Sequence, residues 1–243
     1  MQSEEKKQVL VTYLGHSGFL VELENVYLLF DYCTGRMPHL ALEKPLVVFA
    51  SHVHPDHYHK KIWKLLEEHE DIQYVLSDDI PFLQDQIPGA KILSVEADRK
   101  YELTASAGTV LTIETQQSTD EGVAFWVTCQ GQTVYHAGDL NLWLWSEEGE
   151  DWNQAMEKAF AAQLQKMKGR RADLAFLPLD PRQETYAFAG MDAYLKTIES
   201  KHVFPMHFWG EYKIIQDYLD RSTYDPGHTV IHKIEKKGQQ FLL

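Results

Sequence analysis

The chain has 243 residues, of which 44% are hydrophobic and 24% are charged, and this composition is typical of a folded globular protein rather than a disordered or fibrous one. Its formal net charge of −13 at pH 7 repels a nucleic-acid backbone, which makes a nucleic-acid partner unexpected. The two cysteines, Cys33 and Cys129, lack a CxxC spacing, so neither a disulfide framework nor a cysteine zinc site is expected.

The first half of the chain begins with short apolar runs and continues with alternating strand-like and helix-like segments. Helical spacing of apolar residues predicts a surface helix over 58–70 and a short helical stretch over 80–84. The run 44–52 is continuously apolar, which predicts a strand buried on both faces. The segments predicted as strands in this half are 8–14, 18–24, 26–32, 44–52, 72–77 and 90–96.

The second half repeats this order. Gly131 predicts a hairpin between two of its strands, and Gly169 ends the most regular predicted helix. The predicted strands are 109–115, 122–130, 132–138, 172–179, 201–207, 228–234 and 239–243, and the predicted helices are 150–168, 190–200 and 211–219.

Two halves of this kind predict an α+β fold, a four-layer αβ/βα sandwich of two mixed β-sheets that pack face to face and are flanked by helices. Because no repeat, low-complexity tract or linker divides the chain, we expect a single domain over residues 1–243. No segment has the length and apolar character of a signal peptide or a membrane span, so we expect a cytoplasmic protein without a membrane partner.

The stretch SHVHPDHYHK at 51–60 directly follows the predicted buried strand and contains the pattern HxHxDH. Residues two apart on a turn that leaves a strand can face the same side, so His52 and His54 could hold one metal ion while Asp56 and His57 face a second. His59 falls outside the pattern and is expected to be exposed. A histidine-rich turn that binds nothing is the alternative, and the spacing and the embedded carboxylate argue against it.

This pattern resembles the signature of the metallo-β-lactamase superfamily of metal-dependent hydrolases. The segments TYLGHSGFLVE, LLFDY, YHAGD and VFPMH resemble, in this order, its opening hairpin, next strand, metal-bridging motif and last ligand strand. The likeness extends over nearly the whole chain and is greatest to the small cytoplasmic branch that contains sugar-phosphate lactonase-like proteins. It implies that Asp139 is shared by two metals and that His207 completes the second site.

The sequence departs from the family pattern at the third histidine of the first metal, because no histidine lies between Leu103 and Tyr135. Gln117 or Ser118 occupies the corresponding place, and either is a weaker donor than imidazole. The first site then keeps His52, His54 and Asp139, and the second keeps Asp56, His57, Asp139 and His207. Three accounts stay open: a dinuclear centre with a weak first metal, a mononuclear centre at the second position, and a degenerate centre.

Further residues near these motifs are candidates for supporting roles. His136, three residues before Asp139, and His16, in the LGHSG turn, could substitute for a ligand, hold one in place or touch substrate. Trp143, Trp145 and Trp152 follow Asp139, and Trp209 follows His207. These tryptophans are expected either in the core or in the wall of a substrate pocket.

The resemblance implies one or two divalent metal ions, with zinc placed first and manganese or iron as alternatives. The expected reaction is hydrolysis of an ester, lactone or phosphoester in a small-molecule substrate by a metal-activated water, with Asp56 orienting the nucleophile or acting as a base. A di-iron redox protein on the same fold and a non-catalytic metal-binding or sensor protein are the alternatives. The substrate, the identity and number of the metals and the oligomeric state, which could be a homo-oligomer, are left open.

Overall fold

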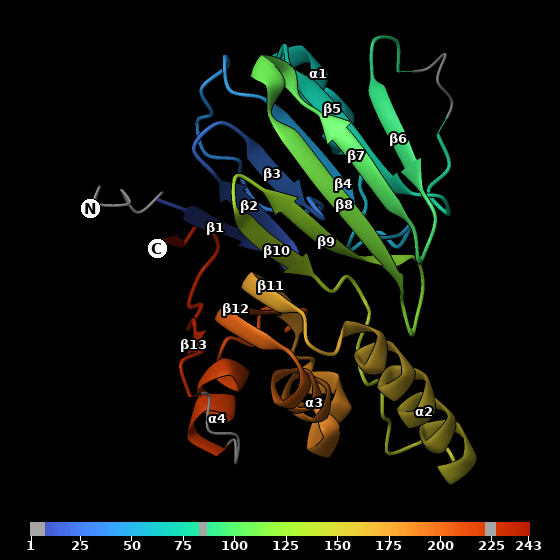
Figure 1. Cartoon of the computed structure of the whole chain (residues 1–243). Coiled ribbons are helices and arrows are strands. Elements are labelled where there is room, and N and C mark those ends of the chain that lie inside the picture. The colour runs from blue at the N-terminus through green and yellow to red at the C-terminus, as the bar shows by residue number, and fades with distance from the viewer. Residues whose placement is uncertain (1–7, 83–86, 222–226) are drawn as a thin grey trace.

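Two seven-stranded β-sheets lie face to face in the computed structural model, which describes residues 8–82, 87–221 and 227–243 (Figure 1). The strand order of the first sheet is β14 (Gln240–Leu242), β1 (Leu10–Gly15), β2 (Gly18–Glu22), β3 (Tyr27–Phe30), β4 (Leu46–Ala50), β5 (Ile72–Ser77) and β6 (Lys91–Val95). The order of the second is β13 (Val230–Ile231), β12 (Glu199–Met206), β11 (Arg171–Pro178), β10 (Gln132–His136), β9 (Val123–Cys129), β8 (Val110–Gln117) and β7 (Lys100–Thr104).

Both sheets are mixed. In each half of the chain the first strands pair antiparallel, and the later strands pair parallel, as β3 to β6 and β10 to β13 do. The hairpin between β9 and β10 turns through Gln130 and Gly131, both at positive φ, which is the geometry of a two-residue type I′ turn. Strand β14 returns from the C-terminus to pair with β1, so the second half of the chain also completes the first sheet.

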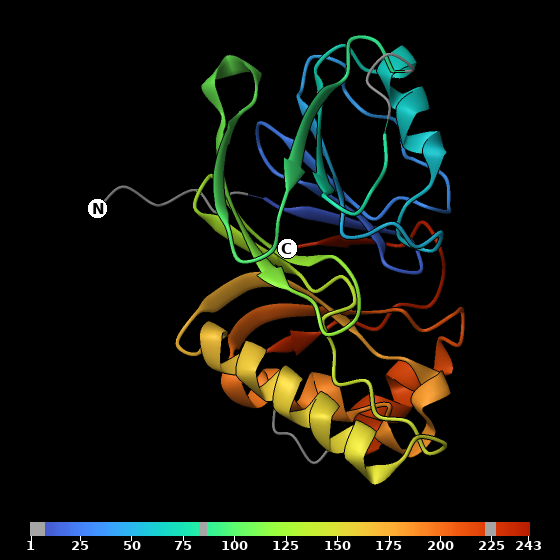
Figure 2. The same ribbon diagram turned by 90° about the vertical axis from the view of Figure 1, so that its right-hand side faces the viewer.

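Helices cover the outer faces of both sheets, as Figure 2 shows. On the first sheet, the short 3-10 helix η1 (Lys60–Lys64) and the helix α1 (Leu65–Glu68) bury Ile62 and Leu65 against β3, β4 and β5. The helices α2 (Glu150–Met167), α3 (Ala189–Thr197) and α4 (Lys213–Arg221) cover the second sheet. The predicted four-layer arrangement is confirmed.

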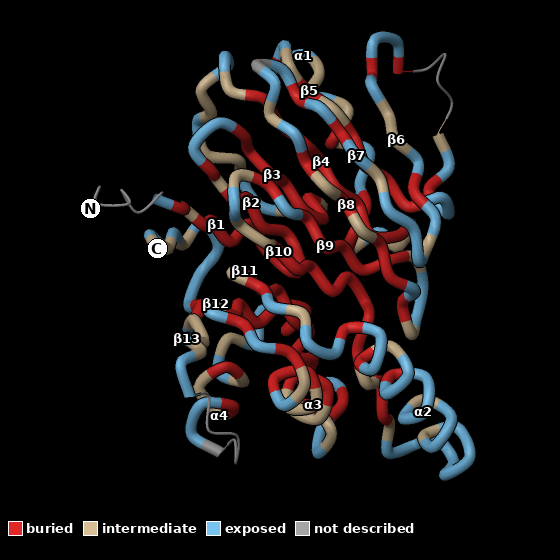
Figure 3. Tube along the Cα trace, in the orientation of Figure 1, coloured by how far each residue is buried: buried red, intermediate tan, exposed pale blue. Residues whose placement is uncertain are grey.

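The main core lies between the two sheets, where the buried strand residues concentrate (Figure 3). Aromatic rings join the sheets directly: Phe19 lies 4.5 Å from Phe176, and Phe49 lies 5.3 Å from Phe125, measured between ring centroids. Every residue of β4 is buried, as its continuous apolar sequence predicts for a central strand with both faces covered.

Several element predictions need correction. The predicted helix 58–70 is shortened to η1 and α1, because His59 is extended and caps η1, and the predicted strand 228–234 is shortened to β13, because only Val230 and Ile231 pair with β12. Strand β7 was not predicted, although Lys100 to Thr104 alternate polar and apolar residues as a half-buried strand does. In the predicted helix 80–84, Ile80 to Phe82 are not helical, and the remainder lies outside the described residues.

Within the part of the chain that the structure describes, no helix is both long enough and apolar enough to cross a membrane. The single domain over residues 1–243 stays a prediction.

Candidate metal centre

Four loops at one edge of the sheets carry the candidate ligands, and each follows the C-terminal end of a strand. The HxHxDH segment follows β4, Asp139 follows β10, His207 follows β12, and His16 lies in the turn between β1 and β2. His16 and His207 adopt φ angles of 54° and 62°. Such angles are uncommon outside glycine and concentrate at functional sites.

Two glycines allow these loops to approach one another closely. Gly122 has a φ of 66°, and a Cβ atom there would collide with the Ser51 carbonyl and the His52 Cβ. Val123 N donates a hydrogen bond to that carbonyl at 3.0 Å, which joins the start of β9 to the loop after β4. Gly138, at a φ of 53°, packs against the Ser51 side chain and delivers Asp139 beside the histidines.

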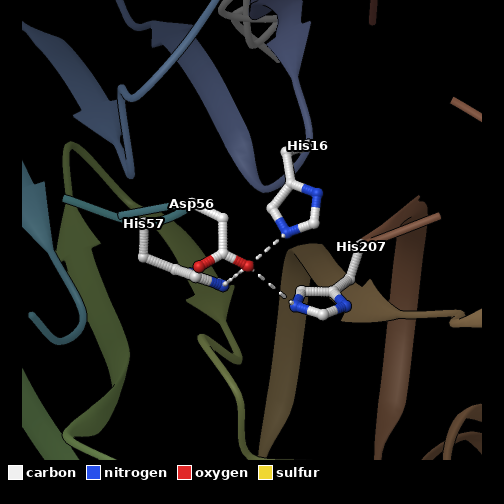
Figure 4. Close-up of side chains that lie close together, drawn as sticks. All are labelled: His16, Asp56, His57 and His207. Atoms are coloured by element: carbon white, nitrogen blue, oxygen red, sulfur yellow. Dashed lines mark ion pairs between the residues drawn. The ribbon is translucent and has the colours of Figure 1, made fainter. Parts of the chain in front are cut away.

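His16, Asp56, His57 and His207 form one compact group, drawn in Figure 4. The Asp56 Oδ2 atom lies 3.1 Å from His16 Nε2, 3.7 Å from His207 Nε2 and 3.9 Å from His57 Nε2. His16 therefore belongs to this group geometrically, although its place in the sequence predicted only a possible supporting role.

The Asp139 carboxylate lies between this group and a second one. Its Oδ1 atom is 3.1 Å from His57 Nε2 and 3.5 Å from His207 Nε2, and its Oδ2 atom is 3.4 Å from His52 Nε2. His52 Nε2 is in turn 3.0 Å from His54 Nδ1. Within each group the donor atoms, one per residue, lie within 4.8 Å of one another. That spacing suits donors around a single ion, since zinc–nitrogen and zinc–oxygen bonds are about 2.0–2.2 Å.

A test of whether these residues fit metal ions comes from polar atoms that are buried without a well-directed hydrogen bond. Four such atoms converge here: His16 Nε2, His57 Nε2, His207 Nε2 and Asp139 Oδ1. Leaving buried polar groups unsatisfied costs about 1–3 kcal/mol each. Divalent cations fit these residues, because an ion in each donor group would give these atoms the partner that they lack.

Two buried carboxylates outside the groups orient the histidines. Asp31 Oδ2 accepts from His57 Nδ1 at 2.7 Å and is itself fixed by the Ser51 side chain at 2.7 Å. Asp180 Oδ2 accepts from His207 Nδ1 at 2.9 Å. A proton held on Nδ1 leaves the Nε2 lone pair facing the groups, which is the arrangement that metal-binding histidines use. Sequence reasoning gave neither residue a role, although each directly follows an apolar strand run.

The charges in this cluster perturb one another strongly. Burial alone would raise the pKa of Asp139, but the imidazoles of His57 and His207 outweigh burial and hold that pKa well below its usual range. Burial favours neutral His57, yet the carboxylates of Asp139 and Asp31 raise the pKa of His57 well above its ordinary value. The metal-free chain thus holds a proton on His57 between two carboxylates, and a divalent cation would take the place of that proton.

The remaining predicted site residues lie elsewhere. Gln117 is exposed, and its amide donates to the Ser118 carbonyl at 3.4 Å, while the Ser118 hydroxyl accepts from Asp120 N at 3.1 Å. Among the described residues neither side chain hydrogen-bonds to a histidine or carboxylate of the donor groups: Gln117 is exposed at the end of β8, and the turn occupies the Ser118 hydroxyl. His136 has both ring nitrogens occupied, by the Ser17 carbonyl at 2.9 Å and by Gly138 N at 3.2 Å, so it supports the backbone before Asp139.

Two acidic residues of the same loop reach the centre instead. Asp120 lines a cavity together with His54, Asp56 and Asp139. Burial and then the Asp139 charge raise the pKa of Asp120, partly offset by His54. Glu121 Oε2 lies 3.5 Å from His54 Nε2, the ring nitrogen that does not face His52. Because short loops between strands carry no periodic pattern, only their acidic character signalled them in the sequence.

The cavity beside the donor groups has a volume of about 400 Å³, toward the lower end of the range of about 300–1,000 Å³ for ligand pockets. The side chains of Trp143, Trp145, Trp152 and Trp209 line it, as one of the two sequence interpretations expected. Arg182, which sequence reasoning did not single out, lines it as well.

Comparisons with known proteins identify the family of the chain. A sequence family described as "Beta-lactamase superfamily domain" matches residues 10–155. The chain is 29% identical over 226 residues to a protein from Opitutus terrae named UPF0173 metal-dependent hydrolase, covering 85% of this chain and 88% of the relative.

Solved structures share the fold. Igni18, a metallo hydrolase from Ignicoccus hospitalis, superposes with a TM-score of 0.63 at 18% identity, over 97% of this chain and 98% of that one. CmlA, a diiron β-hydroxylase from Streptomyces venezuelae, superposes with a TM-score of 0.57 at 10% identity, over 98% of this chain but 54% of that longer one. The extent of the family match, which spans more than half of the chain, means that this protein belongs to the metallo-β-lactamase superfamily of metal-dependent hydrolases.

Proposed function

We propose that the chain hydrolyses an ester, lactone or phosphoester bond in a small molecule at a centre of two divalent ions, with zinc as the first candidate. The observation that carries this proposal is the position of Asp139, with one oxygen toward His57 and His207 and the other toward His52. A carboxylate between two donor groups is suited to join two ions in one site.

The second position is the better furnished of the two. His16, Asp56, His57 and His207 would hold that ion together with Asp139 Oδ1. His16 goes beyond the predicted ligand set, and its buried Nε2 atom has no other well-directed partner in the described chain. This donor set is large enough to hold an ion, which favours an active centre over a degenerate one.

The first position keeps His52 Nε2, His54 Nδ1 and Asp139 Oδ2, and we infer that Asp120 supplies the missing donor. Its carboxylate lines the same cavity and has no hydrogen-bond or ion-pair partner among the described residues. The loop that carries it is clamped, because Thr119 Oγ1 donates to the Asn141 carbonyl at 2.6 Å and accepts from Asn141 N at 3.0 Å. Glu121 would orient His54 from the other side of its ring.

Divalent ions held by these residues would supply Lewis-acid chemistry, which lowers the pKa of water toward neutrality and stabilises negative charge on oxygen. The chain's own contribution centres on Asp56. Burial would raise the pKa of Asp56, but His16 and His57 outweigh burial and hold it well below its usual range, so the carboxylate is ionised at neutral pH. Because its side chain is 26% exposed and lines the cavity, the ionised Asp56 can orient a water molecule by accepting a hydrogen bond from it.

Metal analysis and a substrate panel test this proposal together. We expect the purified chain, stripped and then reloaded with zinc, manganese or iron, to bind two ions and to hydrolyse members of a panel of chromogenic esters, lactones and phosphodiesters. Asp139→Asn should lose both an ion and activity. Two irons with redox turnover and no hydrolysis would instead establish the redox alternative, and full metal occupancy without hydrolysis of any class would establish the binding or sensor alternative.

A further inference from the structure

Arg182 is the one lysine or arginine among the described residues that line the cavity. It lies in the 3-10 helix η4 (Pro181–Tyr186), directly after Asp180, and its side chain is 51% exposed. Elsewhere the chain carries a strong negative charge, and Asp56, Asp120 and Asp139 face the same cavity. A cation in this place therefore needs a chemical explanation.

Hydrogen bonds hold the Arg182 guanidinium in position, but they do not engage all of its donors. Its Nε donates to both oxygens of Asp180 at 3.0 Å, and its Nη2 donates to Asp180 Oδ2 at 2.6 Å. The Nη1 atom has no hydrogen-bond partner in the part of the chain that the structure describes. A guanidinium with one edge fixed and another edge free is prepared to bind a second oxyanion, such as a carboxylate or phosphate group.

Two tryptophan rings lie near the Arg182 guanidinium. The Arg182 guanidinium carbon lies 4.5 Å from the ring centroid of Trp209 and 5.9 Å from that of Trp145. Trp145 is parallel to Trp143 within 4°, with centroids 6.1 Å apart. Trp209 and Trp152 are 48% and 40% exposed, so both retain ring surface that a flat apolar group can contact.

Buried hydrogen bonds fix this wall before any ligand binds. Gln183, the neighbour of Arg182, is buried; its Nε2 donates to the Leu142 carbonyl at 2.7 Å, and its Oε1 accepts from Asn141 Nδ2 at 3.0 Å. These bonds tie η4 to the loop that carries Trp143 and Trp145. The arginine and the tryptophan faces therefore keep their relative positions, which lowers the entropic cost of binding.

We propose that this cavity selects substrates that carry a carboxylate or phosphate group on a flat ring, with Arg182 binding the anion and the tryptophan faces binding the ring. This assignment rests on the proposed hydrolase function, since it names the substrate class of the same site. Asp180 joins the two parts of the site, because its Oδ2 atom contacts both Arg182 and His207. A small ring that reaches from Arg182 to the donor groups would place its scissile bond beside the metal centre.

Binding of inert probes tests the assignment separately from catalysis. The zinc-loaded protein would be titrated with phenylphosphonate, with benzoate and with neutral benzamide, and tryptophan fluorescence would report binding to the cavity. Compared with the wild type, Arg182→Gln should weaken phenylphosphonate or benzoate by at least about tenfold, since a charge-assisted hydrogen bond contributes about 1.5–3 kcal/mol. Benzamide affinity should not change.

Arg170→Gln is the matched control, because Arg170 also pairs with a carboxylate, Glu114, and lies over a tryptophan, Trp126, but does not line the cavity. Arg182→Lys, which keeps the charge without the planar fork, should show an intermediate loss. If Arg182→Gln loses affinity for phenylphosphonate alone, the preferred anion is a phosphate; if it loses affinity for benzoate alone, the preferred anion is a carboxylate.

Equal affinities of wild type and Arg182→Gln for both anions, with metal content unchanged, would overturn the assignment. Equal weakening by Arg170→Gln, or no binding of either anion to the wild type, would do the same. None of these binding results depends on turnover, so a failure here is distinguishable from a failure of the proposed hydrolysis.

Discussion

Asp180→Asn tests whether a residue outside the donor groups controls metal affinity. Asp180 is fully buried, and its Oδ2 atom accepts from His207 Nδ1 at 2.9 Å. Burial would raise the pKa of Asp180, but His207 and Arg182 outweigh burial and lower it to about 2, so the residue is a carboxylate at neutral pH. Asparagine has nearly the same shape and can still accept the hydrogen bond, but it lacks the charge that increases the basicity of the imidazole.

Loss of such an outer partner reduces metal affinity by about 10–100-fold. We expect the upper part of this range, because the carboxylate is shielded from solvent and the substitution also releases Arg182. A 100-fold loss corresponds to about 2.7 kcal/mol of binding free energy.

Competition with a fluorescent zinc chelator would measure the affinity, and elemental analysis would count the ions per chain. Asp173→Asn is the control, since Asp173 accepts from Thr133 N at 2.8 Å and pairs with Lys201, yet contacts no residue of the centre. An Asp180→Asn affinity within threefold of both the wild type and this control would refute the reasoning that Asp180 acts through His207.

Three further predictions address the first metal position, the glycine contact and a histidine pair remote from the centre. Asp120→Asn should lower the affinity for the second zinc ion at least about tenfold in isothermal titration, whereas Asp120→His should retain that affinity. An unchanged affinity in Asp120→Asn would remove Asp120 from the ligand set. Gly122→Ala should cost at least about 2 kcal/mol in urea unfolding, against a smaller loss for Gly131→Ala, whose added Cβ meets nothing within 4 Å, and equal losses would contradict the close-contact argument. Burial and then His202 lower the pKa of His232 to about 4, so the folded state binds fewer protons than the unfolded state between that value and 6.5. Stability should therefore be complete above about pH 6.5 and fall by up to about 3 kcal/mol as the pH drops to 4, and His232→Phe should flatten that part of the profile; an unchanged slope would exclude this linkage.

The sequence alone was enough to predict the two-halved sandwich, and its resemblance to the superfamily pointed to candidate donors that the structure brings close together. Continuous or alternating apolar runs mark strands directly, and the run before Ser51 predicted the wholly buried β4. The HxHxDH spacing and the polar residues that end apolar strands, Asp139 and His207, indicated a common sheet edge. These are local signals, because strand period and strand ends are properties of neighbouring residues.

Only the tertiary structure decided which residues share a space across the chain. His16 joins Asp56, Asp180 joins His207 and Asp120 joins the cavity through contacts between loops far apart in sequence. Gln117 was one of two candidates for the missing ligand by its position, but its exposed side chain donates to the neighbouring Ser118 carbonyl instead. A loop has no repeating period, so its side-chain directions depend on φ angles and packing partners that become defined only when the two sheets meet.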